Sequence, residues 1–452
     1  MPDILIVDDD RDTCQFIAEL LAAPGRNIVY ESNPVHALTI ASHEPFDAVI
    51  SDINLNAPQS GLDILRAARQ MNRRCQVVLI SGFGTLETAI EAVREGAFDY
   101  ISKPFNIAQV KSVVERALSQ SLVPAEAGQA PERAAPAGLI GRTAAMLDVY
   151  KQIALAADAA MPVLVVGESG TGKELVAKAI HAHGRRASRP FVAVNCGAIA
   201  ESLLESELFG HTRGSFTGAV SDTKGLFEQA QGGTILLDEI GETSPASQVK
   251  LLRTLEEGEV RPVGASRTVK IDVRVLAATN MELERAVAEG KFRQDLFYRL
   301  SVIVIRVPAL RERRADIPLL VDAFLRNACS RAGRERRLSD PALEALLAHT
   351  WPGNVRELEN TIERLVLFSP STVIDVADLP PGMDAQAPGT EQDLFGGLPT
   401  LDALERRYLV HVLDSVKGNR TRAAEVMGID RRTLYRMAER FGIDLKDEPG
   451  RS

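Results

Sequence analysis

The sequence predicts a multidomain α/β protein that ends in an all-α domain. Short apolar runs alternate with helix-period segments over residues 1–120, and the same alternation returns over residues 139–308. Strands separated by helical segments are typical of parallel sheets covered on both faces. The pattern over residues 400–445 is entirely helical. A chain of 452 residues is too long for one hydrophobic core and predicts roughly three domains.

The first domain is expected over residues 1–120. Its strand candidates are apolar runs, the last of them weaker than the others: Ile4–Val7, Ala48–Ser51, Val77–Ile80 and Tyr100–Ile101. Residues 121–138 have no periodicity and are rich in Ala, Pro and Gly, which indicates a linker.

The second domain is expected over residues 139–383. Its strand candidates are residues 163–167, 191–195, 234–238, 273–278 and 301–307. From about residue 310 the pattern becomes helical, and Ser339 followed by Asp340 and Pro341 predicts a helix start, so this part is expected to form a small lid. Residues 384–399 are interpreted as a second linker and residues 400–452 as the last domain.

Composition limits the classes of function. The net charge of −9 argues against a protein that coats nucleic acid uniformly, so any DNA binding must be local. The four cysteines lie far apart without metal-ligand spacing, which fits a reducing cytosol: Cys14, Cys75, Cys196 and Cys329. The N-terminus does not have the pattern of a signal peptide, and no apolar run approaches the ~20 residues of a membrane span. A cytoplasmic protein without a membrane partner is expected.

Polar side chains stand at the ends of the predicted strands of the first domain: Asp8, Asp9, Asp52, Ser81 and Lys103. In sheets of this kind, such positions meet at one edge. Three carboxylates at one edge repel each other and attract Mg²⁺. Asp52 could then attack a phosphoryl group, with Ser81 bonding its oxygens and Lys103 neutralising its charge. A single Asp can equally cap a helix, but five matching positions favour a phosphorylation site.

A phosphate-binding loop follows the apolar run Val163–Val166. It consists of Gly167, Glu168, Ser169, Gly170, Thr171, Gly172 and Lys173. Backbone N–H groups and the following helix N-terminus point at nucleotide phosphates in such a loop, and Lys173 meets their charge. Glu174 stands where Ser or Thr usually supplies a hydroxyl to Mg²⁺, so Asp238 is the best candidate for a protein ligand of the metal.

Two carboxylates end the apolar run Ile235–Leu237. Asp238 suits a metal ion, and Glu239 suits the polarisation of an attacking water molecule. These residues and the phosphate-binding loop predict an ATPase site.

A glycine-flanked loop lies between the two halves of this site. Its residues are Gly214, Ser215, Phe216, Thr217, Gly218 and Ala219. A Phe between glycines is badly placed for a core strand. Phe216 and Thr217 are therefore expected to form an apolar and hydrogen-bonding tip for a partner protein.

The last domain has a helix-turn-helix pattern. Gly428 permits a tight turn, and Asp430 is placed to cap a second helix. From Ser415 to Phe441 the chain carries seven Lys or Arg and three Asp or Glu. Arginines of the second helix could enter a major groove, although the sequence does not separate base contacts from phosphate contacts: Arg431, Arg432, Arg436 and Arg440.

Together, these motifs resemble the NtrC family of AAA+ activators, which use ATP to remodel the sigma-54 form of bacterial RNA polymerase. Residues 1–118 resemble the receiver domain of response regulators, and residues 400–443 resemble a Fis-type domain. The resemblance implies a flavodoxin-like receiver, an AAA+ domain with a helical lid, and an all-α helix-turn-helix domain. In the receiver it implies Asp52 as the phosphate acceptor, Mg²⁺ near Asp8, Asp9 and the backbone of Asn54, and Tyr100 as a switch aromatic. Tyr100 fits a core-edge position almost equally well.

The resemblance also assigns roles around ATP. It implies that Asn195 holds Glu239 until nucleotide is in place, that Asn280 reads the γ-phosphate, and that Arg356 reaches back from the motif Trp351–Leu358. Arg293 and Arg299 would be arginine fingers that act on the neighbouring subunit. Such contacts form a ring, implied to be a homohexamer built from homodimers. The Glu at position 174 is shared with the family.

The expected protein is a two-component response regulator that uses ATP and Mg²⁺ to activate transcription. Its expected partners are sigma-54 RNA polymerase at Gly214–Ala219, promoter-upstream DNA and a cognate sensor histidine kinase. In the Fis-type domain, Leu401–Leu413 would pair two subunits, and Thr433 and Tyr435 would join the arginines on DNA. Two alternatives remain at this point: a DNA-binding regulator whose ATPase domain only oligomerises, and a general AAA+ remodeller.

Overall fold

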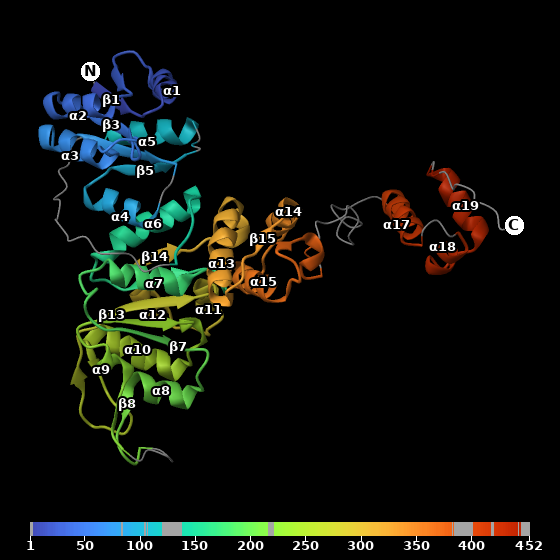
Figure 1. Cartoon of the computed structure of the whole chain (residues 1–452). Coiled ribbons are helices and arrows are strands. Elements are labelled where there is room, and N and C mark those ends of the chain that lie inside the picture. The colour runs from blue at the N-terminus through green and yellow to red at the C-terminus, as the bar shows by residue number, and fades with distance from the viewer. Residues whose placement is uncertain are drawn as a thin grey trace. The chain divides into compact units, whose positions relative to one another are not determined.

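The computed structural model of the chain is shown in Figure 1, and the structure describes ten segments of the chain. They are residues 3–82, 85–103, 105, 107–119, 138–215, 221–381, 383, 401–416, 420–441 and 443. These residues divide into two compact units. One comprises residues 1–335 and 350–368, and the other comprises residues 336–349 and 369–452.

The first domain is a five-stranded parallel sheet with the strand order β2-β1-β3-β4-β5. This order is that of flavodoxin-like folds, as expected. The strands are β1 (Asp3–Val7), β2 (Asn27–Glu31), β3 (Ala48–Asp52), β4 (Gln76–Ser81) and β5 (Asp99–Ser102). The helices are α1 (Arg11–Leu21), α2 (Pro34–His43), α3 (Gly61–Met71), α4 (Leu86–Arg94) and α5 (Ile107–Ser119).

Strand β2 has no counterpart among the sequence predictions. It forms one edge of the sheet, pairs only with β1, and has side chains that are half-buried or exposed. An edge strand does not need the continuous apolar run that marks β3 or β4, so its signal in the sequence is weak.

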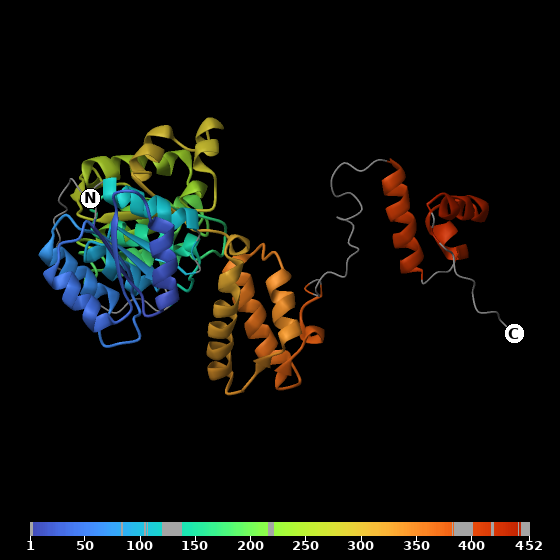
Figure 2. The ribbon, with the colours of Figure 1, turned by 90° about the horizontal axis from the view of Figure 1, so that it is seen from above.

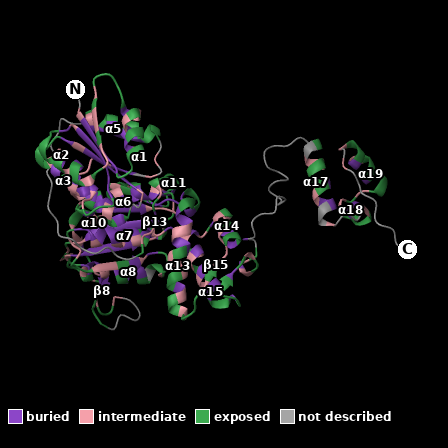
Figure 3. Ribbon diagram, turned by 45° about the horizontal axis from the view of Figure 1, so that its top comes forward, coloured by how far each residue is buried: buried purple, intermediate pink, exposed green. Residues whose placement is uncertain are grey.

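The second domain contains another five-stranded parallel sheet, with the order β14-β6-β13-β10-β7. Its strands are β6 (Val163–Val166), β7 (Phe191–Asn195), β10 (Thr234–Asp238), β13 (Arg274–Thr279) and β14 (Ile303–Arg306). All five predicted strands are present, with ends shifted by up to two residues. The central strands of both sheets are buried, as the purple colouring in Figure 3 shows.

Helices and short hairpins connect these strands. The helices are α6 (Ala144–Ala157), α7 (Lys173–Ala182), α8 (Glu201–Phe209), α9 (Leu226–Gln229), η1 (Ile240–Glu242), α10 (Pro245–Glu257), α11 (Leu283–Ala288) and α12 (Gln294–Leu300). The hairpins pair β8 (Gly210–His211) with β9 (Thr223–Lys224), and β11 (Glu259–Val260) with β12 (Val269–Lys270).

A helical segment follows β14, as predicted. It starts with η2 (Leu310–Glu312) and η3 (Arg314–Asp316) and continues into α13 (Ile317–Ala332); α15 (Asn354–Phe368) comes later in the chain. Helices α13 and α15 lie side by side (Figure 2).

The second unit begins with part of the lid. It contains β15 (Arg337–Leu338), α14 (Asp340–Ala348), β16 (Val373–Ile374) and η4 (Val376–Asp378). Ser339 caps α14 by accepting a hydrogen bond from the Ala342 N–H, and Pro341 lies in the first turn, which confirms the predicted helix start. The parallel pair β15–β16 was not expected in a stretch interpreted as helical.

The described residues of the C-terminal domain form three helices: α17 (Leu401–Ser415), α18 (Arg420–Val426) and α19 (Arg431–Arg440). A small apolar core joins them: Leu409, Val412, Leu413, Ala423, Ala424, Leu434 and Ala438. Gly428 has a φ of 65°, as the tight turn between α18 and α19 requires.

Candidate functional site

Three carboxylates meet at the carboxyl edge of the first sheet. Asp8 and Asp9 follow β1, and Asp52 ends β3 beside it. Asp8 is 1 % exposed and Asp52 is 5 % exposed, whereas Asp9 faces solvent. One oxygen from each carboxylate lies within 4.8 Å of the others. This donor set suits a hard divalent cation such as Mg²⁺.

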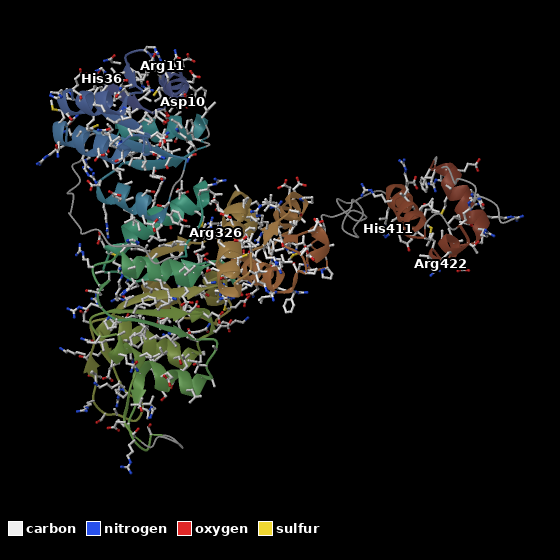
Figure 4. All side chains as sticks on the ribbon, viewed as in Figure 1. Asp10, Arg11, His36, Arg326, His411 and Arg422 are labelled. Carbon is white, nitrogen blue, oxygen red and sulfur yellow. The ribbon has the colours of Figure 1, made fainter. Side chains whose placement is uncertain are left out.

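The next aspartate in the run has a different role. The Asp10 side chain caps α1 by accepting a hydrogen bond from the Asp12 N–H, and the Asp10 N–H donates to Asp8 Oδ1 at 3.0 Å. Figure 4 labels Asp10 beside Arg11, the first residue of α1. Asp10 therefore orients Asp8 and stands outside the cluster.

Lys103 joins two of the carboxylates. Its Nζ lies 2.6 Å from Asp8 Oδ2 and 2.6 Å from Asp52 Oδ2. Burial lowers the pKa of Lys103, but the hydrogen bonds to Asp52 and Asp8 outweigh burial, and the net shift is upward. Burial raises the pKa of Asp8, against the hydrogen bond from Lys103. The lysine therefore stays charged beside both carboxylates.

The remaining residues expected in this pocket lie around it. The Asn54 N–H donates to Asp52 Oδ1 at 3.0 Å, and Ser81 is buried at the end of β4. Tyr100 is 2 % exposed, with its hydroxyl 3.5 Å from Thr88 Oγ1. The sequence interpretation missed Asn56, whose Nδ2 donates to Asp9 Oδ2 at 2.5 Å.

The phosphate-binding loop connects β6 to α7. Gly170 and Gly172 have φ values of 76° and 103°, which favour glycine, and α7 begins at Lys173. Lys173 Nζ donates to the carbonyl oxygens of Gly167 at 2.9 Å and Glu168 at 3.0 Å. The Lys173 side chain is therefore held against the carbonyl oxygens of its own loop, at the N-terminus of α7.

Asp238 and Glu239 lie close enough to act on Lys173. Burial lowers the pKa of Lys173, and the negative charges of Asp238 and Glu239 oppose that shift. Burial also raises the pKa of Asp238, opposed by the Glu239 N–H and by Lys173. Glu239 has a φ of 53°, in the left-handed region. Such a conformation in a non-glycine residue costs free energy and is found most often at functional positions.

Asn195 ends β7 directly beside Asp238. Its Oδ1 accepts hydrogen bonds from the N–H groups of Gly197 at 2.9 Å and Ala198 at 3.0 Å. The expected hydrogen bond from Asn195 to Glu239 is not formed. The two side chains instead border the same glycine, because a Cβ on Gly197 would lie 2.6 Å from Glu239 Oε2 and 3.5 Å from Asn195 Oδ1.

Two further predicted residues lie at the ends of neighbouring elements. Asn280 is exposed immediately after β13, the strand between β6 and β10. Glu174, in the first turn of α7, forms an ion pair with Lys178 at 2.7 Å. In this structure Glu174 thus points along α7.

Arg293 and Arg299 are exposed at the start and end of α12. The Arg293 guanidinium binds both carboxylate oxygens of Asp295, at 3.1 and 2.7 Å. Arg299 donates to the carbonyl oxygen of Leu255 at 3.0 Å. The structure therefore places neither arginine against the phosphate-binding loop of its own chain.

The start of α15 lies on the phosphate-binding loop. The N–H groups of Val355 and Arg356 donate to the Gly170 carbonyl at 3.0 and 3.3 Å, and Arg356 Nη1 lies 3.5 Å from Ser169 Oγ. Asn354 also donates a hydrogen bond to this loop, at the Ser169 carbonyl oxygen. The sequence analysis assigned no role to Asn354, although it belongs to the same motif as Arg356.

The glycine-flanked loop leaves the hairpin β8–β9. Gly214 has a φ of 81°, and Ser215 is half-buried. The expected contact residues Phe216, Thr217, Gly218 and Ala219 lie outside the described residues.

The second helix of the C-terminal domain exposes most of the predicted DNA-binding side chains: Arg431, Arg432, Tyr435 and Arg436. Asp430 caps α19 as expected, by accepting from the Thr433 N–H at 2.8 Å. The Thr433 hydroxyl also donates to Asp430, and Arg420 donates to the Tyr435 hydroxyl at 2.9 Å.

Two contacts in this domain bear on what was expected of Arg440 and α17. Arg440 is held by α17, because it contacts Asp402 at 2.5 Å and Glu405 at 3.6 Å, so its charge is already paired. The part of α17 proposed to pair two subunits is partly used in the domain's own core, where Leu409 and Leu413 are buried.

Four family models match successive parts of the chain. They are the response regulator receiver domain over residues 4–115, the sigma-54 interaction domain over residues 139–306, the AAA+ ATPase lid domain over residues 311–394, and the Fis family of bacterial regulatory proteins over residues 400–439. None of the helices in the described part of the chain has the length and apolar character needed to cross a membrane.

Curated relatives match over nearly the whole length. The chain is 42 % identical to the transcriptional regulatory protein ZraR of Salmonella typhimurium, covering 96 % of this chain and 97 % of the relative. It is 40 % identical to the DNA-binding transcriptional regulator NtrC of Azospirillum brasilense, covering 98 % of each. A solved structure of NtrX from Brucella abortus in complex with ATP shares 35 % identity, with a TM-score of 0.52 over 98 % of this chain and 99 % of that one.

A receiver, a P-loop ATPase and a helix-turn-helix domain on one chain define a response regulator that couples phosphorylation to ATP hydrolysis and DNA binding. The chain belongs to the NtrC family of sigma-54-dependent response regulators. It is a transcriptional activator that hydrolyses ATP to remodel sigma-54 RNA polymerase and open promoters.

Proposed function

We propose that Asp52 accepts a phosphoryl group from a cognate sensor histidine kinase. The carboxylates of Asp8, Asp9 and Asp52 would hold Mg²⁺ together with the backbone of Asn54, and the metal would reduce the charge repulsion against the incoming phosphoryl group. Lys103 already lies 2.6 Å from Asp52 and would neutralise the added charge. Phosphate would change the surface of the receiver and thereby alter ring assembly.

ATP hydrolysis is assigned to the loop from Gly167 to Glu174 and to the end of β10. Lys173 would meet the phosphates, Asp238 would help to hold Mg²⁺, and Glu239 would orient the attacking water. The single observation that carries this proposal is the burial of Lys173 in the field of Asp238 and Glu239. One cation and two carboxylates at the ends of two strands of the same sheet, β6 and β10 with β13 between them, could act together on a nucleotide's γ-phosphate.

Further residues would report the state of the nucleotide. Asn280 follows β13, the strand between the P-loop strand and β10, and would read the γ-phosphate from there. Asn195 shares the space around Gly197 with Glu239 and would bond Glu239 in a second state of the site. Arg356 would reach the phosphates from the lid, since it already touches Ser169.

Arg293 and Arg299 would complete the site of a neighbouring subunit. Both are exposed, and both are bonded on their own chain to groups that water can replace, which supports a role in trans. A head-to-tail contact of this kind closes into a ring. The proposed assembly is a homodimer that forms a homohexameric ring.

The two outer contacts of the assembly are with polymerase and with DNA. Residues Gly214–Ala219 would contact sigma-54 during remodelling, and α19 would bind promoter-upstream DNA in the major groove. Because promoter DNA and polymerase are the substrates of this activity, the protein is proposed to work in the cytoplasm.

The overall proposal is tested by ATP-driven opening of a sigma-54 promoter in vitro, with and without acetyl phosphate. Open complexes that require ATP and change in amount with phosphorylation are the expected result. Hydrolysis of ATP without any engagement of sigma-54 under either condition would overturn the proposal.

Asp52→Asn is expected to abolish phosphorylation by acetyl phosphate. The amide keeps the shape of the side chain but is not a nucleophile. Asp10→Asn is the matched control, because Asn also caps helices and the same charge is removed two residues from Asp8. Phosphate-affinity electrophoresis should show a shifted band for the Asp10→Asn variant, as for the wild-type protein, and none for Asp52→Asn. A shifted band for Asp52→Asn would place the phosphate elsewhere.

Arg436→Ala is expected to weaken binding to promoter-upstream DNA by about tenfold, within the range of one lost base or phosphate contact. Arg440→Ala should change binding much less, because Asp402 and Glu405 already pair with that guanidinium. Fluorescence anisotropy over a series of salt concentrations measures both affinity and salt dependence. Equal losses for the two variants would show that α19 does not present the face proposed here.

A further inference from the structure

A fully buried asparagine joins three segments of the ATPase domain. Asn354 is 0 % exposed and begins α15 with a φ of 54°, a conformation that Asn tolerates better than most residues. Its Oδ1 accepts a hydrogen bond from the Leu310 N–H at 2.8 Å. Its Nδ2 donates to Glu168 Oε2 at 3.1 Å and to the Ser169 carbonyl at 3.0 Å. One side chain thus connects the P-loop, the first turn of the lid and the helix that carries Arg356.

Glu168 is the partner on the P-loop side. Arg311 binds both of its carboxylate oxygens, at 2.7 and 2.5 Å. The hydrogen bonds from Arg311 and then from Asn354 lower the pKa of Glu168 to about 2. Glu168 therefore stays ionised at neutral pH and holds Arg311, next to Leu310, as well as Asn354.

The backbones at this junction are in contact as well. A Cβ on Gly170 would lie 2.3 Å from the Gly353 carbonyl oxygen, so no larger residue fits. The Arg356 N–H donates to the Gly170 carbonyl. In contrast, the Arg356 side chain is exposed and has only a 3.5 Å contact with Ser169 Oγ. The direction of Arg356 is therefore set mainly by the turn that Asn354 fixes.

We propose that Asn354 and Glu168 are positioning residues that hold the lid on the P-loop and aim Arg356 at the bound nucleotide. This inference rests on the role proposed above for Arg356. If exchange of ATP for ADP displaced the backbone at positions 168–170, Asn354 would transmit that displacement directly to the lid. Glu168 thus acts at the lid side of the loop, whereas Lys173 acts on the phosphates.

Asn354→Asp tests the proposal in the full-length protein. Asp keeps the size, the tolerance for the left-handed backbone and the acceptor for Leu310, but it places a second carboxylate against Glu168. A lost hydrogen bond to a charged group predicts that the affinity for a fluorescent ADP analogue falls about tenfold or more. Glu168→Gln is the milder second variant. Its matched control is Glu363→Gln, because Glu363 lies on α15, the same helix as Asn354, but pairs with Arg331 of α13 at 2.5 Å.

Arg356→Ala separates positioning from stability. If Asn354 acts through Arg356, Asn354→Asp should lower ADP affinity strongly in the wild-type chain and less than about twofold in the Arg356→Ala background. Losses that multiply in the double variant, or a lower Tm with unchanged ADP affinity and KM, would overturn the inference. An Arg356→Ala variant with normal nucleotide affinity and turnover would instead refute the role proposed for Arg356 itself.

Discussion

Arg299→Ala is expected to lower ATP turnover by about 10³-fold, which is the lower end of the contribution of an arginine supplied to a phosphoryl-transfer transition state. Nucleotide binding should change little, because Arg299 bonds the Leu255 carbonyl of its own chain and not the P-loop. Arg293→Ala should behave in the same way. Steady-state ATPase assays at ring-forming protein concentrations, with ADP affinity measured in parallel, would show this split.

Mixing two inactive variants decides between action in trans and in cis. A subunit with Arg299→Ala keeps its Glu239, and a subunit with Glu239→Gln keeps its Arg299, so a mixed ring regains complete sites only where Arg299 acts on its neighbour. Recovery of ATPase activity on mixing is the expected result, and no recovery would indicate a role in cis. Arg326→Ala is a control for loss of an exposed arginine, because Arg326, labelled in Figure 4, pairs with Asp322 on α13.

Much of both sites could be predicted from the sequence because their residues stand at strand ends or in contiguous motifs. Asp52 closes a short apolar run that forms the buried strand β3, and Lys173 follows a glycine pattern whose backbone conformation is set locally. Burial of a strand's apolar run fixes where the next polar residue emerges. Asn195 and Asp238 each end such a run, and the structure places them side by side.

The features that could not be predicted depend on contacts between distant segments. Asn354 and Glu168 each belong to a motif that the sequence shows, but they are separated by 186 positions, and no local pattern indicates that their side chains are in contact. Arg440 looked available for DNA because its partners Asp402 and Glu405 lie in another helix. Strand β2 was missed for a local reason. It is an edge strand whose side chains are half-buried or exposed, so its sequence shows little hydrophobic periodicity.

Thr217→Ala is expected to abolish sigma-54 promoter opening while leaving ATP hydrolysis largely intact. The hairpin β8–β9 carries the loop that contains Thr217, whereas hydrolysis is assigned to strand ends β6 and β10 and to α12. A contact surface outside the hydrolytic site can be removed without changing the chemistry, provided that the ring still forms. ATPase rates and open-complex yield, measured on the same preparation, separate the two activities.

Ser215→Ala is the matched control, because it removes a hydroxyl from the same loop but leaves the proposed tip, Phe216 and Thr217, unchanged. It should keep both activities, which would show that the loss in Thr217→Ala belongs to the tip and not to the loop as a whole. Equal loss of hydrolysis and promoter opening in Thr217→Ala would mean that the loop also supports the ATPase site. The contact with sigma-54 and the ATP site would then depend on each other, and the division of roles proposed here would be wrong.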